Sequence, residues 1–72
     1  MISPTGSFMI KINGENKDID NVLLTDYLAE NGYRPERIAV ECNEMMVPKA
    51  EYENFVLHSG DVVEIVSFVG GG

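Results

Sequence analysis

The pattern of hydrophobic and polar positions predicts a β-hairpin at the start of the fold. Residues 9–12, Met-Ile-Lys-Ile, have the alternation and β-branched content of a strand. Asn13-Gly14 follows at once and is the dipeptide best suited to a two-residue hairpin turn, so residues 17–20 can return antiparallel to the first strand. Residues 1–8 show no period, and we expect them to form a flexible extension outside the domain.

The period then changes from that of a strand to that of a helix. From about residue 23 to residue 31, Leu24, Tyr27 and Leu28 fall on one helical stripe, and polar residues occupy the other positions. Gly32 stands where the C-terminal cap of such a helix belongs. This segment predicts one short amphipathic helix.

The next segment predicts a longer strand and then a short one at the edge of a sheet. Residues 38–42 alternate, so that Ile38, Val40 and Cys42 share one face and Cys42 is expected to be a small buried apolar group. Pro48 limits the strand of residues 45–47 to an edge, because proline cannot donate to a ladder. Met45 and Met46 are expected to fill gaps against the sheet.

Residues 49–57 have no clean period and predict an irregular loop, from which Tyr52 and Leu57 can cover the core. A turn at residues 59–61 then leads into a final strand of residues 61–69.

In the final strand, alternation places Val63 and Ile65 on one face and Val66 and Phe68 on the other, together with Val62 and Glu64. If the helix covers the first face, Val66 and Phe68 form an exposed apolar pair, and such patches often contact partners. The loop after Pro48 could instead cover the second face as well. The sequence leaves both arrangements open.

The order of these elements predicts an α+β fold, a mixed sheet with one helix packed across one face. A chain of 72 residues has room for one small domain, which we place at residues 9–69. The three glycines that follow, residues 70–72, are expected to form a flexible tail.

Charge and composition narrow the classes of function. Twelve acidic and five basic residues give a net charge of -7, which opposes binding to nucleic acid and favours a partner with a basic surface. One cysteine and one histidine are too few for a structural zinc site, and His58 is expected to be a solvated surface residue. The sequence has no apolar run long enough to predict a membrane span. We expect a cytoplasmic protein that is a monomer when free.

The chemistry that remains is that of the terminal carboxylate on Gly72. Gly70-Gly71-Gly72 cannot form a phosphate loop, since a helix would have to follow the glycines. Glycines can pass through a narrow channel and leave the carbonyl of Gly72 open to attack. A carboxylate must first be activated, for instance by adenylation with ATP, and nothing else in this chain supplies a nucleotide site. The activating enzyme would therefore be a partner, although a frayed chain end would show the same glycines.

Several segments of the chain resemble the ThiS family of thiamine-biosynthesis sulfur carriers. They are Met9-Ile-Lys-Ile-Asn-Gly14, Arg37-Ile-Ala-Val-Glu41, Asn43, Val47-Pro48-Lys49, Gly60-Asp61-Val-Val-Glu-Ile-Val66 and Phe68-Val69-Gly-Gly-Gly72. The resemblance runs from Met9 to Gly72, and residues 1–8 have no counterpart in it.

This resemblance implies a ubiquitin-like β-grasp fold and a carrier protein that is not itself an enzyme. It implies that a ThiF-like adenylyltransferase uses ATP to adenylate Gly72, that the carboxylate becomes a thiocarboxylate, and that thiazole synthase receives the sulfur. Gly70 and Gly71 would then thread the tail into these partners, and Val66, Phe68 and Val69 would bind them. Two alternatives share the diglycine end: a carrier like the small subunit of molybdopterin synthase, and a ubiquitin-like protein modifier.

Overall fold

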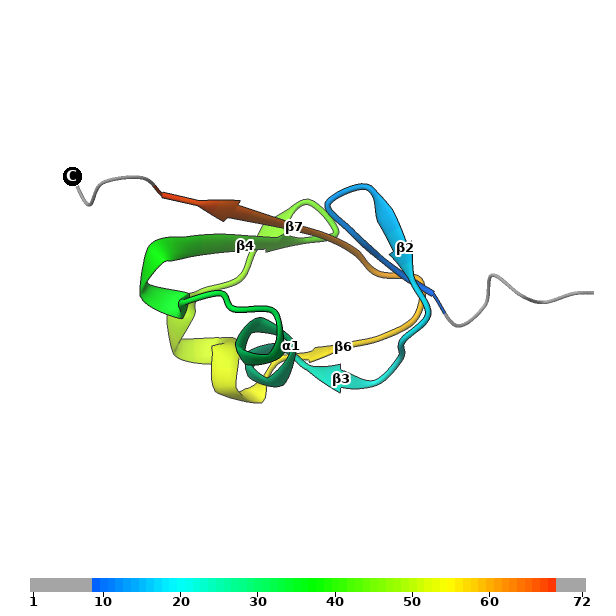
Figure 1. Cartoon of the computed structure of the whole chain (residues 1–72), viewed down its shortest axis with the longest axis horizontal. Helices are drawn as coiled ribbons and strands as arrows, with labels where there is room; N and C mark the ends of the chain where they lie inside the picture. The colour runs from blue at the N-terminus through cyan, green and yellow to red at the C-terminus, as the bar shows by residue number, and fades with distance from the viewer. Residues whose placement is uncertain (1–8, 69–72) are drawn as a thin grey trace, which may run out of the picture.

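The fold is a mixed five-stranded sheet with a helix across one face, seen in a computed structural model that describes residues 9–68. The sheet has the order β2-β1-β7-β4-β5, and β7 runs parallel to β1 and antiparallel to β4. Its strands are β1 (Ile10–Ile12), β2 (Glu15–Lys17), β4 (Ile38–Cys42), β5 (Met45–Met46) and β7 (Val62–Ser67). In Figure 1 the helix α1 (Leu24–Glu30) lies on one side of this sheet. The predicted α+β architecture is confirmed.

The N-terminal hairpin forms around the predicted turn, but its second strand is shifted. Asn13 has φ 52° and Gly14 has φ +84°, the two left-handed conformations that a tight hairpin turn requires. The return strand is β2, with Ile12 opposite Glu15 and Ile10 opposite Lys17, so the prediction of residues 17–20 was wrong. A two-residue turn lets pairing begin directly after Gly14, which places the strand earlier in the chain.

The helix α1 begins and ends close to the predicted positions. Leu24, Tyr27 and Leu28 are its buried residues, as the helical stripe predicted. At its end the N–H of Tyr33 donates to the carbonyl of Leu28 at 2.9 Å, and the N–H of Gly32 donates to that of Ala29 at 3.3 Å. These are the two bonds of a Schellman cap, and Gly32 has the left-handed φ of +78° that the cap needs.

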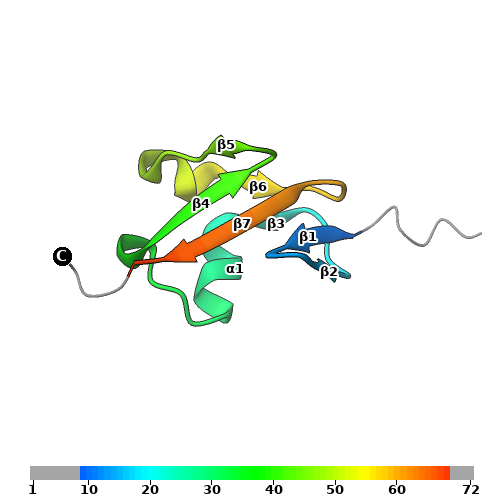
Figure 2. The ribbon, with the colours of Figure 1, turned by 90° about the horizontal axis from the view of Figure 1, so that it is seen from above.

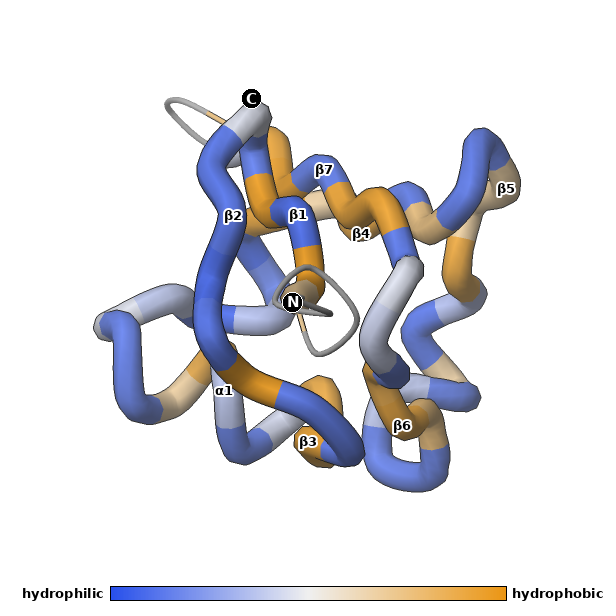
Figure 3. The backbone as a smooth tube through the Cα atoms, turned by 90° about the vertical axis from the view of Figure 1, so that its right-hand side faces the viewer, coloured by the Kyte–Doolittle hydropathy of each residue, from blue (hydrophilic) through white to orange (hydrophobic). Residues whose placement is uncertain are grey.

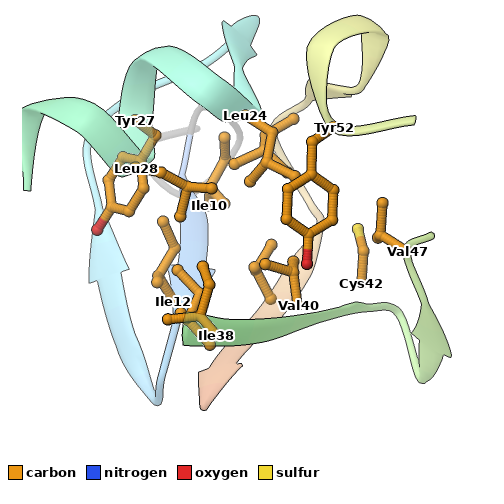
Figure 4. Packing of buried hydrophobic residues seen from close by; sticks show 13 residues of the cluster. Ile10, Ile12, Leu24, Tyr27, Leu28, Ile38, Val40, Cys42, Val47 and Tyr52 are labelled. Carbon is orange, nitrogen blue, oxygen red and sulfur yellow. The ribbon is translucent and has the colours of Figure 1, made fainter. Parts of the chain in front are cut away.

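The core lies between the sheet and the layer that contains α1, and Figure 4 shows its side chains meeting there. Its buried members are Ile10, Ile12, Leu24, Tyr27, Leu28, Ile38, Val40, Cys42, Val47, Tyr52, Leu57, Val63 and Ile65. Alternate residues of β4 and β7 supply five of them, which confirms the predicted facing of both strands. Cys42 is buried, as expected, beside Val47 and Tyr52.

The segment from Lys49 to Leu57 is regular, so the prediction of an irregular loop was wrong. The 3-10 helix η3 covers Lys49–Asn54, and the strand β6 (Val56–Leu57) pairs with β3 (Val22–Leu23) in a small antiparallel ladder. Tyr52 and Leu57 are buried, as predicted. Another 3-10 helix, η2 (Pro35–Arg37), leads into β4. The β3–β6 ladder escaped prediction because its strands are two residues long and lie far apart in the sequence.

The prediction that Met45 and Met46 fill gaps against the sheet was wrong. Their side chains are 72% and 63% exposed. The reason is the position of β5, which is the edge strand predicted from Pro48 and pairs with β4 alone in the sheet. Figure 3 shows this hydrophobic strand at an outer edge of the fold.

Within residues 9–68, the chain has no helix that is both long enough and apolar enough to cross a membrane.

Candidate functional site

The strand β7 leads toward the glycine tail and presents apolar side chains to solvent. It lies between β1 and β4 near the middle of the sheet (Figure 2). Val63 and Ile65 point into the core, whereas Val66 is 57% exposed and Phe68, directly after the strand, is 53% exposed. The predicted exposed pair is therefore present, and the alternative in which the loop after Pro48 covers it is excluded.

The lysine Lys49 holds the end of β7 in place. Its Nζ atom donates a hydrogen bond of 2.6 Å to the carbonyl of Ile38. The same atom lies 5.8 Å from the centre of the Phe68 ring and 5.6 Å from that of the Tyr52 ring, within the range of a cation–π interaction. The backbone N–H of Phe68 also donates to the carbonyl of Arg37 at 2.8 Å. Both the ring and the backbone of Phe68 are thus fixed where the described chain ends.

Sequence reasoning did not find this role of Lys49. The residue appeared only as part of the Val47-Pro48-Lys49 segment that carries the family resemblance. Its contact with Phe68 joins residues far apart in the sequence, and it exists because β4 and β7 pair so that Ile38 lies opposite Ser67.

The beginning of β7 is held by a second group of polar contacts. The Oδ1 atom of Asn43 accepts from the N–H of Val62 at 2.9 Å, and its Nδ2 atom donates to Asp61 at 3.0 Å. Asp61 also accepts from the backbone N–H of His58 at 2.9 Å. The side chain of His58 is exposed, as predicted, and only its backbone takes part here.

Cys42 is unsuited to sulfur chemistry. Burial raises the pKa of its thiol, and the neighbouring Asp61 carboxylate raises this pKa further. The thiol therefore stays protonated at neutral pH, and a protonated thiol is a poor nucleophile. Cys42 lines a hollow of about 550 Å³ together with Met45, Met46, Phe55 and His58. That hollow adjoins Asp61, at the opposite end of β7 from Phe68.

The remaining predicted site residues are Val69, Gly70, Gly71 and Gly72, which lie outside the described residues. Among residues 9–68, no group of three or more His, Cys, Asp or Glu side chains is arranged to hold a metal ion. The described part of the site is thus the end of β7, where contacts with Lys49 and Arg37 hold Phe68 in place.

Comparison of the sequence and the fold with known proteins identifies a family. The model of the ThiS family matches residues 10–72. The chain is 37% identical over 68 residues to the sulfur carrier protein ThiS of Bacillus subtilis, a match that covers 89% of this chain and 100% of that protein. A crystal structure of the thiamine biosynthesis protein ThiS of Geobacter metallireducens superposes with a TM-score of 0.74 at 25% identity, covering 89% of this chain and 99% of that one.

A longer protein also contains a similar segment. A thiazole synthase of Paramagnetospirillum magneticum is 39% identical over 62 residues, which are 85% of this chain but only 19% of that protein. The chain therefore spans about a fifth of the thiazole synthases that it matches. From the family match, the full-length relatives and the shared β-grasp fold, this chain belongs to the ThiS family.

Proposed function

We propose that this protein carries sulfur for thiamine biosynthesis as a thiocarboxylate on Gly72. The observation that supports this most directly is the end of β7, where an anchored strand presents Phe68 just ahead of the sequence Val69-Gly70-Gly71-Gly72. A rigid domain followed by glycines can deliver a terminal carboxylate into the site of another enzyme. The names of the full-length relatives support the same function.

The chemistry requires two steps at the carboxylate group of Gly72. In the first, the Gly72 carboxylate attacks the α-phosphate of ATP, which releases pyrophosphate and forms an acyl adenylate. In the second, hydrosulfide attacks the carbonyl carbon, the bond from that carbon to AMP breaks, and AMP and a proton leave, so that a thiocarboxylate remains. A glycine at this position places no side chain beside the carbon that is attacked.

The partners proposed for these steps are a ThiF-like adenylyltransferase, which would bind the ATP, and thiazole synthase, which would receive the sulfur. The occurrence of a similar segment within thiazole synthases supports the second partner. Val66, Phe68 and Val69 would contact these enzymes, and Gly70 and Gly71 would thread the tail. We also propose that the reaction takes place in the cytoplasm, because the activation step requires ATP.

Intact-mass measurement tests this function. The protein is purified after incubation with ATP, the adenylyltransferase of the same organism and a sulfur donor, and in parallel from cells. We expect one oxygen atom at the C-terminus to be replaced by sulfur, and this change to disappear on incubation with thiazole synthase and its substrates. Covalent adducts of Gly72 with lysines of other proteins would instead show a ubiquitin-like modifier. Transfer of sulfur to a molybdopterin precursor would show the other alternative.

A further inference from the structure

The sheet has one uncovered face, and the exposed apolar side chains of the described structure gather near it. Large exposed apolar side chains occur only on β5, on β7 and directly after β7 within residues 9–68. We call the solvent side of β4, β5 and β7 the outer sheet face. Its residues are Ala39, Glu41, Met46, Val62, Glu64 and Val66. Figure 1 shows that α1 lies on the other side of the sheet.

At the centre of the outer sheet face two carboxylates oppose each other. Glu41 of β4 and Glu64 of β7 are direct partners in the antiparallel register. Directly opposed side chains have Cβ atoms about 4.5 to 5.5 Å apart, and like charges at this distance destabilise a sheet. The ion pairs among residues 9–68 are Lys17 with Glu15 and Arg34 with Glu36, so neither central glutamate has one.

Apolar side chains border this pair in the register of the sheet. Met46 is the partner of Glu41 on β5, and Val66 follows Glu64 by two residues on the same face of β7. Met46 and Val66 are 63% and 57% exposed. Two adjacent carboxylates bordered by exposed apolar groups can bind a partner's side chain that has an apolar stem and a forked cationic end.

We propose that the outer sheet face docks onto the adenylating partner, and that an arginine of that partner lies over the Glu41 and Glu64 carboxylates. This rests on the proposed function, because it takes the adenylyltransferase as the occupant. The guanidinium can donate to both carboxylates at once and is more weakly hydrated than an ammonium, so arginine suits this position better than lysine. The net charge of -7 favours the same partner chemistry.

Docking would then relieve a repulsion that the free carrier tolerates. The two glutamates would weaken the free sheet and strengthen the complex. A residue that serves only the fold would affect stability and binding in the same direction. These glutamates are expected to affect them in opposite directions, and this difference separates the two roles.

The test uses the full chain with Glu64→Lys and measures melting temperature and the Kd for the purified adenylyltransferase. Lysine at this position would pair with Glu41, so we expect the melting temperature to rise by about 2 to 4 °C. Binding should weaken by about tenfold or more, because the new cation faces the arginine of the partner. The KM for the carrier in adenylation should rise, with kcat at saturation unchanged, since the chemistry at Gly72 is untouched.

Glu30→Lys is the matched control, because Glu30 is also exposed but lies in α1, away from the outer sheet face. It changes the net charge equally, and lysine near the end of a helix is also stabilising. We expect its Kd to stay within about twofold of the unmodified protein. Glu64→Gln should act in the same directions as Glu64→Lys, but less strongly.

Two results would overturn the proposal: equal Kd values for Glu64→Lys and Glu30→Lys, or a lower melting temperature for both Glu64 variants. Failure of the proposed function would look different, since the unmodified protein itself would then not be adenylated.

Discussion

Cys42 and Lys49 show how the surroundings of one side chain decide whether it can serve the site. Cys42 carries the one sulfur nucleophile of the chain, but it lies in the core with a raised pKa. Lys49 has no reactive role of its own, yet it contacts both the Ile38 carbonyl and the Phe68 ring. Cys42, which its chemistry would suggest as a reactive group, is therefore buried and unreactive. Lys49, which its chemistry would not suggest, contacts Phe68 at the end of the described chain.

Replacing Cys42 with serine tests whether the thiol has any part in sulfur transfer. We expect Cys42→Ser to accept sulfur normally, because the reacting carbon belongs to Gly72. The free energy of unfolding should fall by about 1 to 3 kcal/mol, since the hydroxyl is buried in an apolar site. Denaturant unfolding and intact-mass measurement check the two expectations. A folded Cys42→Ser protein that no longer accepts sulfur would contradict this account of the thiol.

Replacing Lys49 with methionine tests its contact with Phe68. The substitution keeps an unbranched side chain of similar length but removes the hydrogen bond to Ile38 and the cation–π contact. We expect a loss of about 0.5 to 1 kcal/mol in the free energy of unfolding and a change in the NMR shifts of the Phe68 ring. Lys49→Arg is the control, because it keeps the cation. Unchanged Phe68 shifts in Lys49→Met would show that the lysine does not hold the ring.

At the scale of the element, the single strand β7 both stabilises the core and presents side chains to which a partner can bind. Its inward residues, Val63 and Ile65, complete the core, while its outward residues remain free for a partner. Pairing on both sides, with β1 and β4, fixes the strand firmly. A change on the outward face can therefore alter binding without unfolding the protein.

Replacing Phe68 with alanine tests this separation. We expect Phe68→Ala to weaken binding to the adenylyltransferase by about 1 to 3 kcal/mol, as loss of an aromatic interface anchor commonly does. The melting temperature should change by less than about 4 °C, because the side chain is 53% exposed. Binding kinetics and a melting curve provide the measurements.

Phe55→Ala is the comparison variant, because Phe55 is partly buried and packs against the core. We expect it to lower the melting temperature more than Phe68→Ala, with little effect on the affinity of the folded protein. A large loss of stability in Phe68→Ala would instead place Phe68 among the residues that support the fold.

At the scale of the whole molecule, folding and reaction involve separate parts of the chain. The core consists of residues between Ile10 and Ile65, whereas the proposed reaction takes place at Gly72. The chain has twelve acidic and five basic residues and a net charge of -7. Such a charge speeds encounter with a basic partner more than it strengthens the final complex.

Removing Gly72 tests the division between domain and tail. We expect a chain that ends at Gly71 to melt at the same temperature as the full chain and to show no ATP-dependent adenylation, because its carboxylate stops one residue short of the reacting position. Gly71→Leu should have the same effect by obstructing the narrow channel. The matched control begins at Met9 and keeps Gly72; we expect it to be adenylated normally. Full adenylation of the chain without Gly72 would contradict the proposed function.

The sequence by itself determined those features that depend on neighbouring residues. The Asn13-Gly14 turn, the helix with its Gly32 cap and the alternation of β4 and β7 follow from local backbone preferences and from side-chain period. The chemistry proposed for Gly72 stays a prediction that rests on local sequence alone.

Only the tertiary structure decided which distant segments meet. The β3–β6 ladder joins two short strands, each too brief to show a period. Strand order and register decide that Met46 is exposed and that Glu41 lies opposite Glu64. The alternation of apolar and polar residues does not by itself determine which strands pair. Lys49 reaches Phe68 for the same reason: the packing of the whole sheet, and no signal within either segment, brings their side chains together.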